Sequence, residues 1–153
     1  MSQTQWSTPV TLFKLVDDEQ GFSVDPSLLK RIITEELTQL LNSQPSGLPS
    51  RFQGDPLLES SVLHYGLGIT IGEAISSQHF PQIERAIKTA IIRFEPRIDS
   101  QTLTVSIIPL SMRTHSISQL TLRITAQVLF YPQNITLCLA GTYDATSARA
   151  WFE

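Results

Sequence analysis

The sequence predicts a single α+β domain, spanning residues 1–153, in which N-terminal helices pack on one face of a three-stranded antiparallel β meander. Two observations lead to this prediction. Apolar residues recur at helical spacing in the first part of the chain, and after Pro96 they alternate with polar residues instead. The length fits one domain that buries its own core, and residues 1–24 are predicted to form a flexible N-terminal segment.

The first predicted helix runs from Pro26 to about Asn42. Asp25 and Pro26 favour a helix start, because Asp is a preferred N-cap residue and Pro fits the first helical position. The following apolar residues recur at helical spacing: Leu29, Ile32, Ile33, Leu37, Leu40 and Leu41. Residues 43–55 are rich in proline and glycine, so a loop is predicted there.

A short apolar element that ends in a glycine turn is predicted over residues 61–68, and a short helix over residues 69–77. The second long helix begins at Pro81 and is strongly amphipathic. Its apolar face consists of Ile83, Ala86, Ile87, Ala90, Ile91 and Phe94. On its exposed side, Glu84 and Lys88 have the spacing of an ion pair on one helix face.

Three strands are predicted in the second half, where apolar and polar residues alternate along residues 103–107, 118–130 and 135–143. Residues 131–134, with the sequence Tyr-Pro-Gln-Asn, have the composition of a tight turn. One face of this sheet is apolar and the other is mostly Thr, Ser and Gln, as expected where only one face meets the core. The last of the three strands is predicted to be an outer strand.

The composition narrows the classes of function. A formal net charge of −3, without a run of Lys or Arg, argues against binding to nucleic acid, which requires a basic surface. Charged residues make up 16% of the chain, against roughly 25% in typical soluble domains, and a weakly charged surface favours burial against other proteins. Neither a secretory signal nor an apolar run of about 20 residues is recognisable, so a cytoplasmic protein is expected.

The stretch Phe94-Glu95-Pro96-Arg97-Ile98 joins the second long helix to the first strand. Proline ends the helix, because its ring clashes with the preceding turn and it lacks an N–H group. A carboxylate and a guanidinium are therefore held on either side of a stiff corner. Two interpretations are open: Glu95 and Arg97 form an ion pair that fixes the corner, or both face a partner protein and form charge-assisted hydrogen bonds with it.

Little in the sequence indicates catalysis. The histidines lack metal-ligand spacing, Cys138 lies in a strand between apolar neighbours, and no glycine-rich phosphate loop occurs. No metal site, cofactor or small-molecule substrate is therefore expected. The one enzymatic alternative is a glycosidase that uses Glu95 with Asp99 as acid and base. Arg97 lies between them and is expected to lower the pKa of Glu95, whereas a general acid requires a raised pKa.

Three motifs occur in order along the chain: Leu40-Leu41-Asn42 at the end of the first helix, Val62-Leu63-His64-Tyr65-Gly66-Leu67, and the Glu95-Pro96-Arg97 corner. They are preceded by an apolar and acidic stretch at residues 12–18. Together these motifs resemble the baseplate wedge proteins of contractile injection machines, namely the TssE component of type VI secretion and its phage-tail counterpart. That family carries a historical lysozyme-like label, and His64 stands where its members usually have Asn.

The resemblance implies a structural role and no enzymatic activity. Members lie in the baseplate wedge beside its larger subunits and start polymerisation of the sheath, because their sheet imitates the strand-exchange part of a sheath subunit. The implied partners are wedge and sheath subunits. The implied partner-binding residues are Glu95, Pro96, Arg97, Tyr65 and Gly66.

A meander also leaves outer strands with unpaired backbone groups, to which an extended arm of a partner can add. The protein would be cytoplasmic and recruited to the membrane-docked baseplate, so that it meets the membrane only through the assembled apparatus. On this hypothesis, Arg97→Ala leaves the isolated domain folded but stops sheath assembly. Cleavage of peptidoglycan through Glu95 is the alternative.

Overall fold

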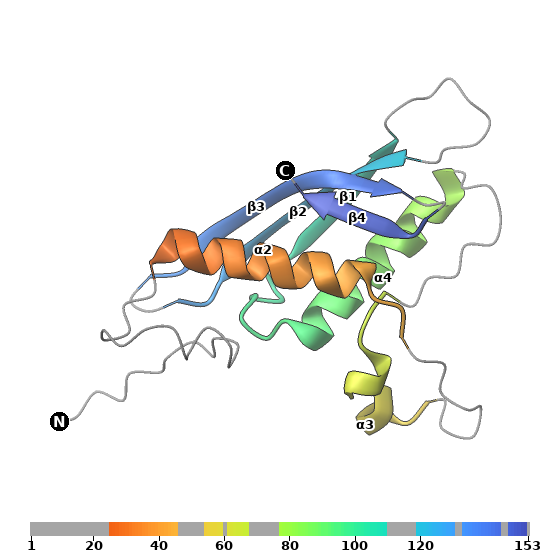
Figure 1. Ribbon diagram of the computed structural model, residues 1–153, viewed down its shortest axis with the longest axis horizontal. Coiled ribbons are helices and arrows are strands. Elements are labelled where there is room, and N and C mark those ends of the chain that lie inside the picture. Colours follow the sequence, from red (N-terminus) through yellow and green to blue (C-terminus); the bar gives the residue numbers. More distant parts are fainter. Residues whose placement is uncertain are drawn as a thin grey trace.

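A computed structural model describes residues 25–45, 54–59, 61–67, 77–109, 119–130, 133–144 and 147–152 (Figure 1). The helices are α2 (Pro26–Asn42), α3 (Pro56–Glu59) and α4 (Phe80–Phe94), with 3₁₀ turns η2 (Val62–His64) and η3 (Ser77–His79). The strands are β1 (Thr104–Pro109), β2 (Gln119–Val128), β3 (Ile135–Asp144) and β4 (Arg149–Phe152). The predicted N-terminal segment and nearly all of the predicted short helix at 69–77 lie outside the described residues.

The two long helices are confirmed. Helix α2 has the predicted bounds, and Asp25 occupies the N-cap position in an extended conformation. The Asp25 carboxylate accepts a hydrogen bond from the hydroxyl group of Ser27, and it caps no backbone N–H of the helix. Helix α4 begins one residue before Pro81 and ends at Phe94, where the sequence places its end.

In the described part of the chain the sheet has four antiparallel strands in the order β1-β2-β3-β4, so the predicted count of three strands is wrong. Strand β4 pairs only with the second part of β3, from Gly141 to Asp144. Its four residues are too few for an alternating pattern to be recognised, and Ala150 is the one that is buried. Among the strands that the structure describes, β3 is therefore an outer strand only along residues 135–140.

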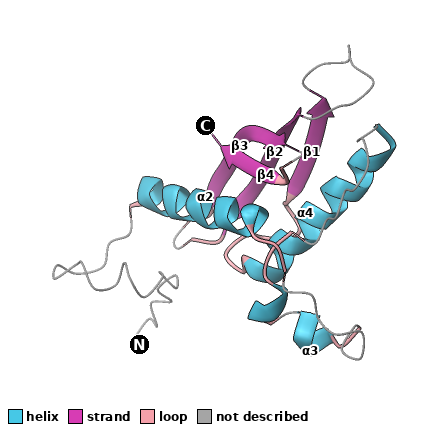
Figure 2. Cartoon of the chain, turned by 45° about the vertical axis from the view of Figure 1, so that its right-hand side comes forward, coloured by secondary structure: helices cyan, strands magenta, loops and turns pink. Residues whose placement is uncertain are grey.

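One hydrophobic cluster joins the helices to the sheet. Helix α2 contacts β4 and β3, helix α4 contacts β1, and the two helices contact each other; Figure 2 shows them beside the sheet. The buried residues of the long helices are Leu29, Ile32, Ile33, Leu37, Leu40, Leu41, Ile83, Ile87, Ala90 and Ile91. In β2, every second residue is buried and the residues between them are partly exposed, as the alternation in the sequence predicts.

Side chains from both long helices form hydrogen bonds with backbone groups of the sheet that point away from the neighbouring strand. Asn42, the last residue of α2, accepts a hydrogen bond from the Ala150 N–H (2.7 Å) and donates one to the Ala150 carbonyl (2.8 Å). The Glu84 carboxylate of α4 accepts a hydrogen bond from the N–H of Ile107 in β1 (2.8 Å). Pro109, two residues further along β1, has no N–H to offer. A backbone group that is bonded in this way is no longer open to pairing with another chain.

Candidate functional site

The Glu-Pro-Arg corner closes the end of α4 and fixes the chain against the end of β2. The Glu95 N–H donates the last helical hydrogen bond to the Ile91 carbonyl (2.8 Å), and the Glu95 carbonyl accepts one from the Ile98 N–H (3.1 Å). The Arg97 carbonyl then accepts a hydrogen bond from the N–H of Leu129, just after β2 (2.8 Å). Proline cannot continue the helix, so the chain turns at this position and returns to the sheet.

Glu95 and Arg97 form a buried ion pair within this corner. Arg97 Nε lies 2.7 Å from Glu95 Oε1, and Arg97 Nη2 lies 2.5 Å from Glu95 Oε2, so that the guanidinium binds both carboxylate oxygens. The same Nη2 also contacts a carboxylate oxygen of Glu36 from α2. Glu95 is 4% exposed and Arg97 is 9% exposed. We call Glu36, Glu95 and Arg97 the corner ion cluster.

Of the two interpretations left open by the sequence, an ion pair within the chain is present, and it is buried. Direct contact of Glu95 and Arg97 with a partner stays a prediction, and Pro96 is the residue of this motif that is exposed. Burial also changes the expectation for Arg97→Ala. Removal of the cation would leave a buried carboxylate uncompensated, so the isolated domain would lose stability.

Burial raises the pKa of Glu95 from 4.5 to about 7, and the hydrogen bond from the Arg97 backbone N–H acts in the opposite direction. Burial likewise lowers the pKa of Arg97. The expectation of a lowered pKa for Glu95 beside Arg97 is therefore wrong in its net direction, because the loss of hydration outweighs the hydrogen bond from the Arg97 backbone N–H. The sequence could not reveal this, because it did not indicate how deeply the corner is buried.

Tyr65 and Gly66 lie next to this corner. The rings of Tyr65 and Phe94 meet edge to face, with centroids 5.3 Å apart. Burial, together with the negative charge of Glu95, raises the pKa of Tyr65. Gly66 has φ +131°, and a Cβ there would overlap the carbonyl group of Ser43, whose carbon would lie 2.7 Å away. All five residues predicted for partner binding therefore belong to one region around the end of α4.

Asp99, the second carboxylate of the glycosidase alternative, has a structural role here. Its Oδ1 accepts a hydrogen bond from the Gln101 N–H (2.9 Å), and its carbonyl accepts one from the Thr102 N–H (3.1 Å). Its own N–H donates to the carbonyl of Gln127 in β2 (2.9 Å). Asp99 thus supports the turn before β1, and its hydrogen bonds give no sign of a catalytic arrangement with Glu95.

Three polar residues that join distant parts of the chain were not identified as such from the sequence. Glu36 completes the corner ion cluster, Asn42 binds β4, and Glu84 binds β1. Each lies on a predicted helix, but their partners lie elsewhere in the chain. The spacing of Glu84 and Lys88 suggests an exposed ion pair on one helix. The sequence therefore does not indicate the contact of Glu84 with Ile107.

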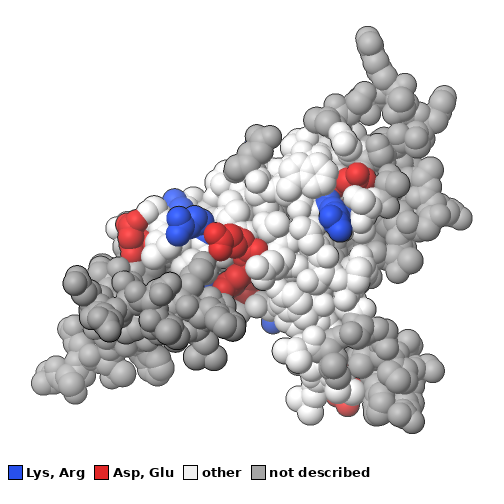
Figure 3. All heavy atoms as spheres, in the orientation of Figure 1, with Lys and Arg blue, Asp and Glu red and all other residues white. Residues whose placement is uncertain are grey.

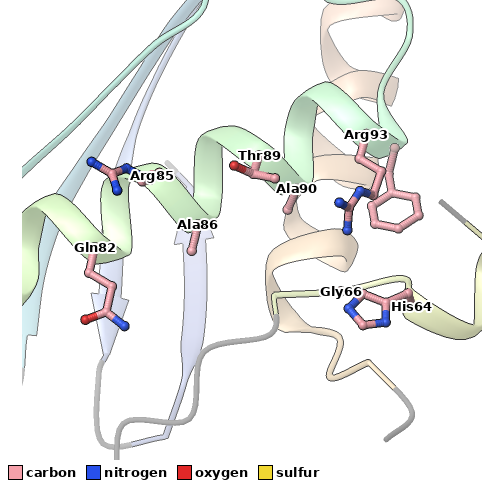
Figure 4. Close-up of a pocket in the computed structure, with 9 residues that line it drawn as sticks. His64, Gly66, Gln82, Arg85, Ala86, Thr89, Ala90 and Arg93 are labelled. Carbon is pink, nitrogen blue, oxygen red and sulfur yellow. The ribbon is translucent and has the colours of Figure 1, made fainter. Parts of the chain in front are cut away.

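A cavity of about 320 Å³ lies beside the same region, between α4 and the turn that contains His64 and Gly66 (Figure 4). Its residues from α4 share one stripe of the helix: Gln82, Arg85, Ala86, Thr89, Ala90, Arg93 and Phe94. The Nδ1 atom of His64 is shielded from solvent and has no hydrogen-bond partner among the described residues. No pattern in the sequence indicates this cavity, because it depends on how residues 61–67 fold against α4.

No group of three or more His, Cys, Asp or Glu side chains with the arrangement of a metal site occurs in the described part of the chain. Within the same ranges, no helix has both the length and the apolar character needed to cross a membrane.

Comparison with protein families gives a match over residues 27–133 to the family described as baseplate wedge protein gp25. The matched region extends from the start of α2 to the turn before β3, so it includes the corner ion cluster and the cavity. Comparisons with curated proteins and with solved structures give no match. Because the match covers more than half of the chain, this protein belongs to the baseplate wedge gp25 family, which includes the TssE-type proteins.

Proposed function

We propose that this protein is a structural component of the baseplate of a contractile type VI secretion machine, where it joins the wedge and initiates sheath polymerisation by strand exchange. Family membership supports the baseplate role. The weakly charged surface supports assembly with other proteins, and on the face seen in Figure 3 most of the described surface carries neither acidic nor basic side chains. The protein would act in the cytoplasm, at the membrane-docked baseplate.

The observation that supports strand exchange is a difference between the strands at the edges of the sheet. Some of their outward backbone groups are hydrogen-bonded by side chains of the same chain, and others are not paired with a described strand. Asn42 covers β4 at Ala150, and Glu84 covers β1 at Ile107, two residues before Pro109. By contrast, none of the described strands pairs with the outward side of β3 along residues 135–140. We call this segment the open margin of β3.

The register identifies the backbone groups at this margin. In an antiparallel ladder, the N–H and C=O groups of successive residues point alternately to the two sides of a strand. The backbone N–H and C=O groups of Ala150 bond to Asn42 and therefore point away from β3. The backbone groups of its neighbour Trp151 point the opposite way, toward Thr142 of β3. The backbone groups of Thr142 thus point toward β4 and away from β2. By the same alternation along β3, the backbone groups of Ala140 and Cys138 also point away from β2. They are the groups to which an incoming extended arm would bond.

Substitution of Cys138 by proline tests this proposal. Proline removes the outward N–H, while the bonds between β2 and β3 keep their donors. Cys138→Ala is the matched control, because it removes the same exposed side chain and keeps the N–H. We expect labelled sheath subunits to form no foci in cells with Cys138→Pro and normal foci with Cys138→Ala. Normal foci in a stably folded Cys138→Pro variant would contradict strand exchange at this margin.

The wedge contact is proposed for the region around the end of α4, with Glu95, Pro96, Arg97, Tyr65 and Gly66. Exposed Pro96 would touch the neighbouring wedge subunit, and buried Glu95 and Arg97 would fix the shape of the corner that carries it. Substitution of Pro96 by Glu introduces a charge at the exposed position and leaves the residues of the corner ion cluster in place. It should weaken co-purification with wedge subunits, and a cooperative thermal melt of the isolated protein shows that the variant stays folded without the proline.

One observation favours the enzymatic alternative. The pKa of Glu95, raised to about 7 by burial, is in the range of a general acid. However, a general acid must reach the substrate, and the Glu95 carboxylate is 4% exposed with both oxygens held by Arg97. Purified protein and its Glu95→Gln variant, incubated with peptidoglycan, test this alternative. Release of muropeptides by the first and not by the second would establish the glycosidase.

A further inference from the structure

We propose that the outward face of the sheet, centred on Arg123 of β2, docks a helix of a neighbouring subunit of the machine. That helix would present an aspartate or glutamate among small and apolar residues. This inference rests on the proposed baseplate function and adds a second contact to it. Strand exchange uses backbone groups at the edge of β3, whereas this contact uses side chains on the face of the sheet.

The described helices pack on one face of the sheet. In β2, alternate residues from Leu120 to Val128 are buried in the hydrophobic cluster to which α2 and α4 contribute. The residues between them point to the opposite face, where they are exposed or partly exposed: Gln119, Thr121, Arg123, Thr125 and Gln127. An antiparallel sheet can leave such a face in water, so it is available to another chain.

The sizes of the outward side chains favour a rounded partner. One row across the sheet takes a residue from each strand, in the order Ile108, Thr121, Thr142 and Trp151. The two ends carry large apolar side chains, with Ile108 54% exposed and Trp151 43% exposed. With neighbouring strands about 4.8 Å apart, these ends lie roughly 14 Å from each other. A helix with its side chains is about 10–12 Å wide, so one helix can lie over the threonines between them.

Arg123 determines the charge that the docked helix must carry. Its cross-strand neighbours are Ser106 and Ala140, and along β2 it lies between Thr121 and Thr125. None of these four side chains is charged. The guanidinium is exposed, and no described residue forms an ion pair with it. Because a guanidinium binds a carboxylate through two parallel hydrogen bonds, Asp or Glu is the complementary partner residue.

The residue types on this face are those of a binding surface. Trp and Arg are enriched among the residues that dominate binding energy, and Trp151 and Arg123 lie on the same face. The charged register partners Asp144 and Arg149 lie at one end of the face, as in an interface with a polar rim. A second copy of this chain is a poor partner, because a two-fold contact centred on Arg123 would bring two guanidinium groups together.

A site-specific cross-link tests the inference. Gln119 is exposed and lies two residues before Thr121 on the same face, so a photoreactive amino acid there samples the docked helix. In cells that assemble the machine, we expect mass spectrometry to locate the cross-link in a helix of another subunit, close to an Asp or Glu. A cross-link to a segment without an acidic residue, to this chain or to a second copy would overturn the inference. The absence of any cross-link in assembled machines would overturn it as well.

Charge reversal and a change of size provide the quantitative arms. Arg123→Glu should reduce the cross-link yield about tenfold or more, and replacement of the captured acidic residue by Lys should restore it. Lys88→Glu is the matched control, because it makes the same change of charge at an exposed position of α4. Thr121→Tyr keeps a residue type that favours strands but fills the middle of the row, so it should lower the yield without a change of charge.

These variants should stay folded, because substitutions on an exposed face usually change stability little. Thermal melts check this, and Arg123→Gln tests the same charge if Arg123→Glu fails to fold. A wild-type yield from a folded Arg123 variant would contradict the contact with a carboxylate. A wild-type yield from folded Thr121→Tyr would contradict docking over the threonines.

The outcome separates this contact from the proposed function. Sheath foci are scored in the Cys138 variants, whereas the cross-link is scored at Gln119. Normal dependence of the foci on the open margin of β3, together with failure of the cross-link, would remove the helix contact and leave the baseplate role intact. Loss of both would count against the baseplate role itself.

Discussion

Replacement of Arg97 by methionine would test how the corner ion cluster stabilises the protein. Met retains the length and much of the apolar volume of the side chain but removes the charge. The Glu95 carboxylate, 4% exposed, would then be buried without the group that binds both of its oxygens. Removal of one partner from a buried ion pair typically destabilises a protein by about 3–5 kcal/mol. Glu36 is 24% exposed and can be hydrated by water instead, so Glu95 should account for most of the loss.

The double variant Glu95→Leu, Arg97→Met is the control for this effect. Replacement of a whole buried pair by apolar residues is often neutral or stabilising, so the double variant should be more stable than Arg97→Met alone. Urea unfolding at pH 8, followed by circular dichroism, measures both variants against the wild type. For a chain of this length, each kcal/mol corresponds to about 2–4 °C in Tm, so the loss is also visible in thermal melts.

The pH dependence provides a further check on the same variant. At pH 5 the orphaned carboxyl group can take up a proton, so the destabilisation caused by Arg97→Met should be smaller than at pH 8. A loss of less than about 1 kcal/mol at pH 8 would place the pair among exposed ion pairs and refute this reasoning. A double variant that is no more stable than the single variant would refute it as well.

Three further predictions concern the contacts around this region. Asn42→Ala removes both hydrogen bonds to Ala150, so the free energy of unfolding should fall by about 1–3 kcal/mol. Hydrogen exchange at the Ala150 amide should also accelerate. Asn42→Asp keeps the acceptor for this amide and should preserve more of its protection from exchange. Gly66→Ala should destabilise the protein by about 2 kcal/mol or more in urea unfolding, because of its positive φ and the overlap with Ser43. Because the folded pKa of Glu95 lies above its ordinary value, the contribution of this group to stability is fully present below about pH 4.5 and is lost as the pH rises through about 7. Between pH 5 and 8 the wild type should therefore lose stability relative to Glu95→Gln, by at most about 1.4 kcal/mol per pH unit. The opposite slope would contradict the raised pKa.

The parts of the fold that depend on local sequence were predictable. Asp25-Pro26 and the helical spacing of apolar residues indicate the bounds of α2, and the alternation from Leu120 to Val128 indicates a half-buried strand. Short elements held by distant contacts were not predictable. Strand β4 depends on pairing with β3 and on Asn42, and neither contact leaves a periodic pattern in its four residues.

The candidate site was predictable in its position and not in its environment. The Glu95-Pro96-Arg97 sequence identifies the corner, because a helix that reaches this proline cannot continue through it. Its burial depends on Glu36 and on the chain after β2, which lie far away in the sequence. The direction of the Glu95 pKa shift follows from that burial, so it too could be obtained only from the three-dimensional arrangement.

The bond pair between Asn42 and Ala150 has a mechanical consequence. A side-chain amide offers the same donor and acceptor as a peptide group, so the last turn of α2 acts as a substitute strand beside β4. The first and last described elements are thereby joined to each other by residues that lie 108 positions apart in the chain. Fraying of either element should loosen the other, so the two would open as one cooperative unit under tension or heat.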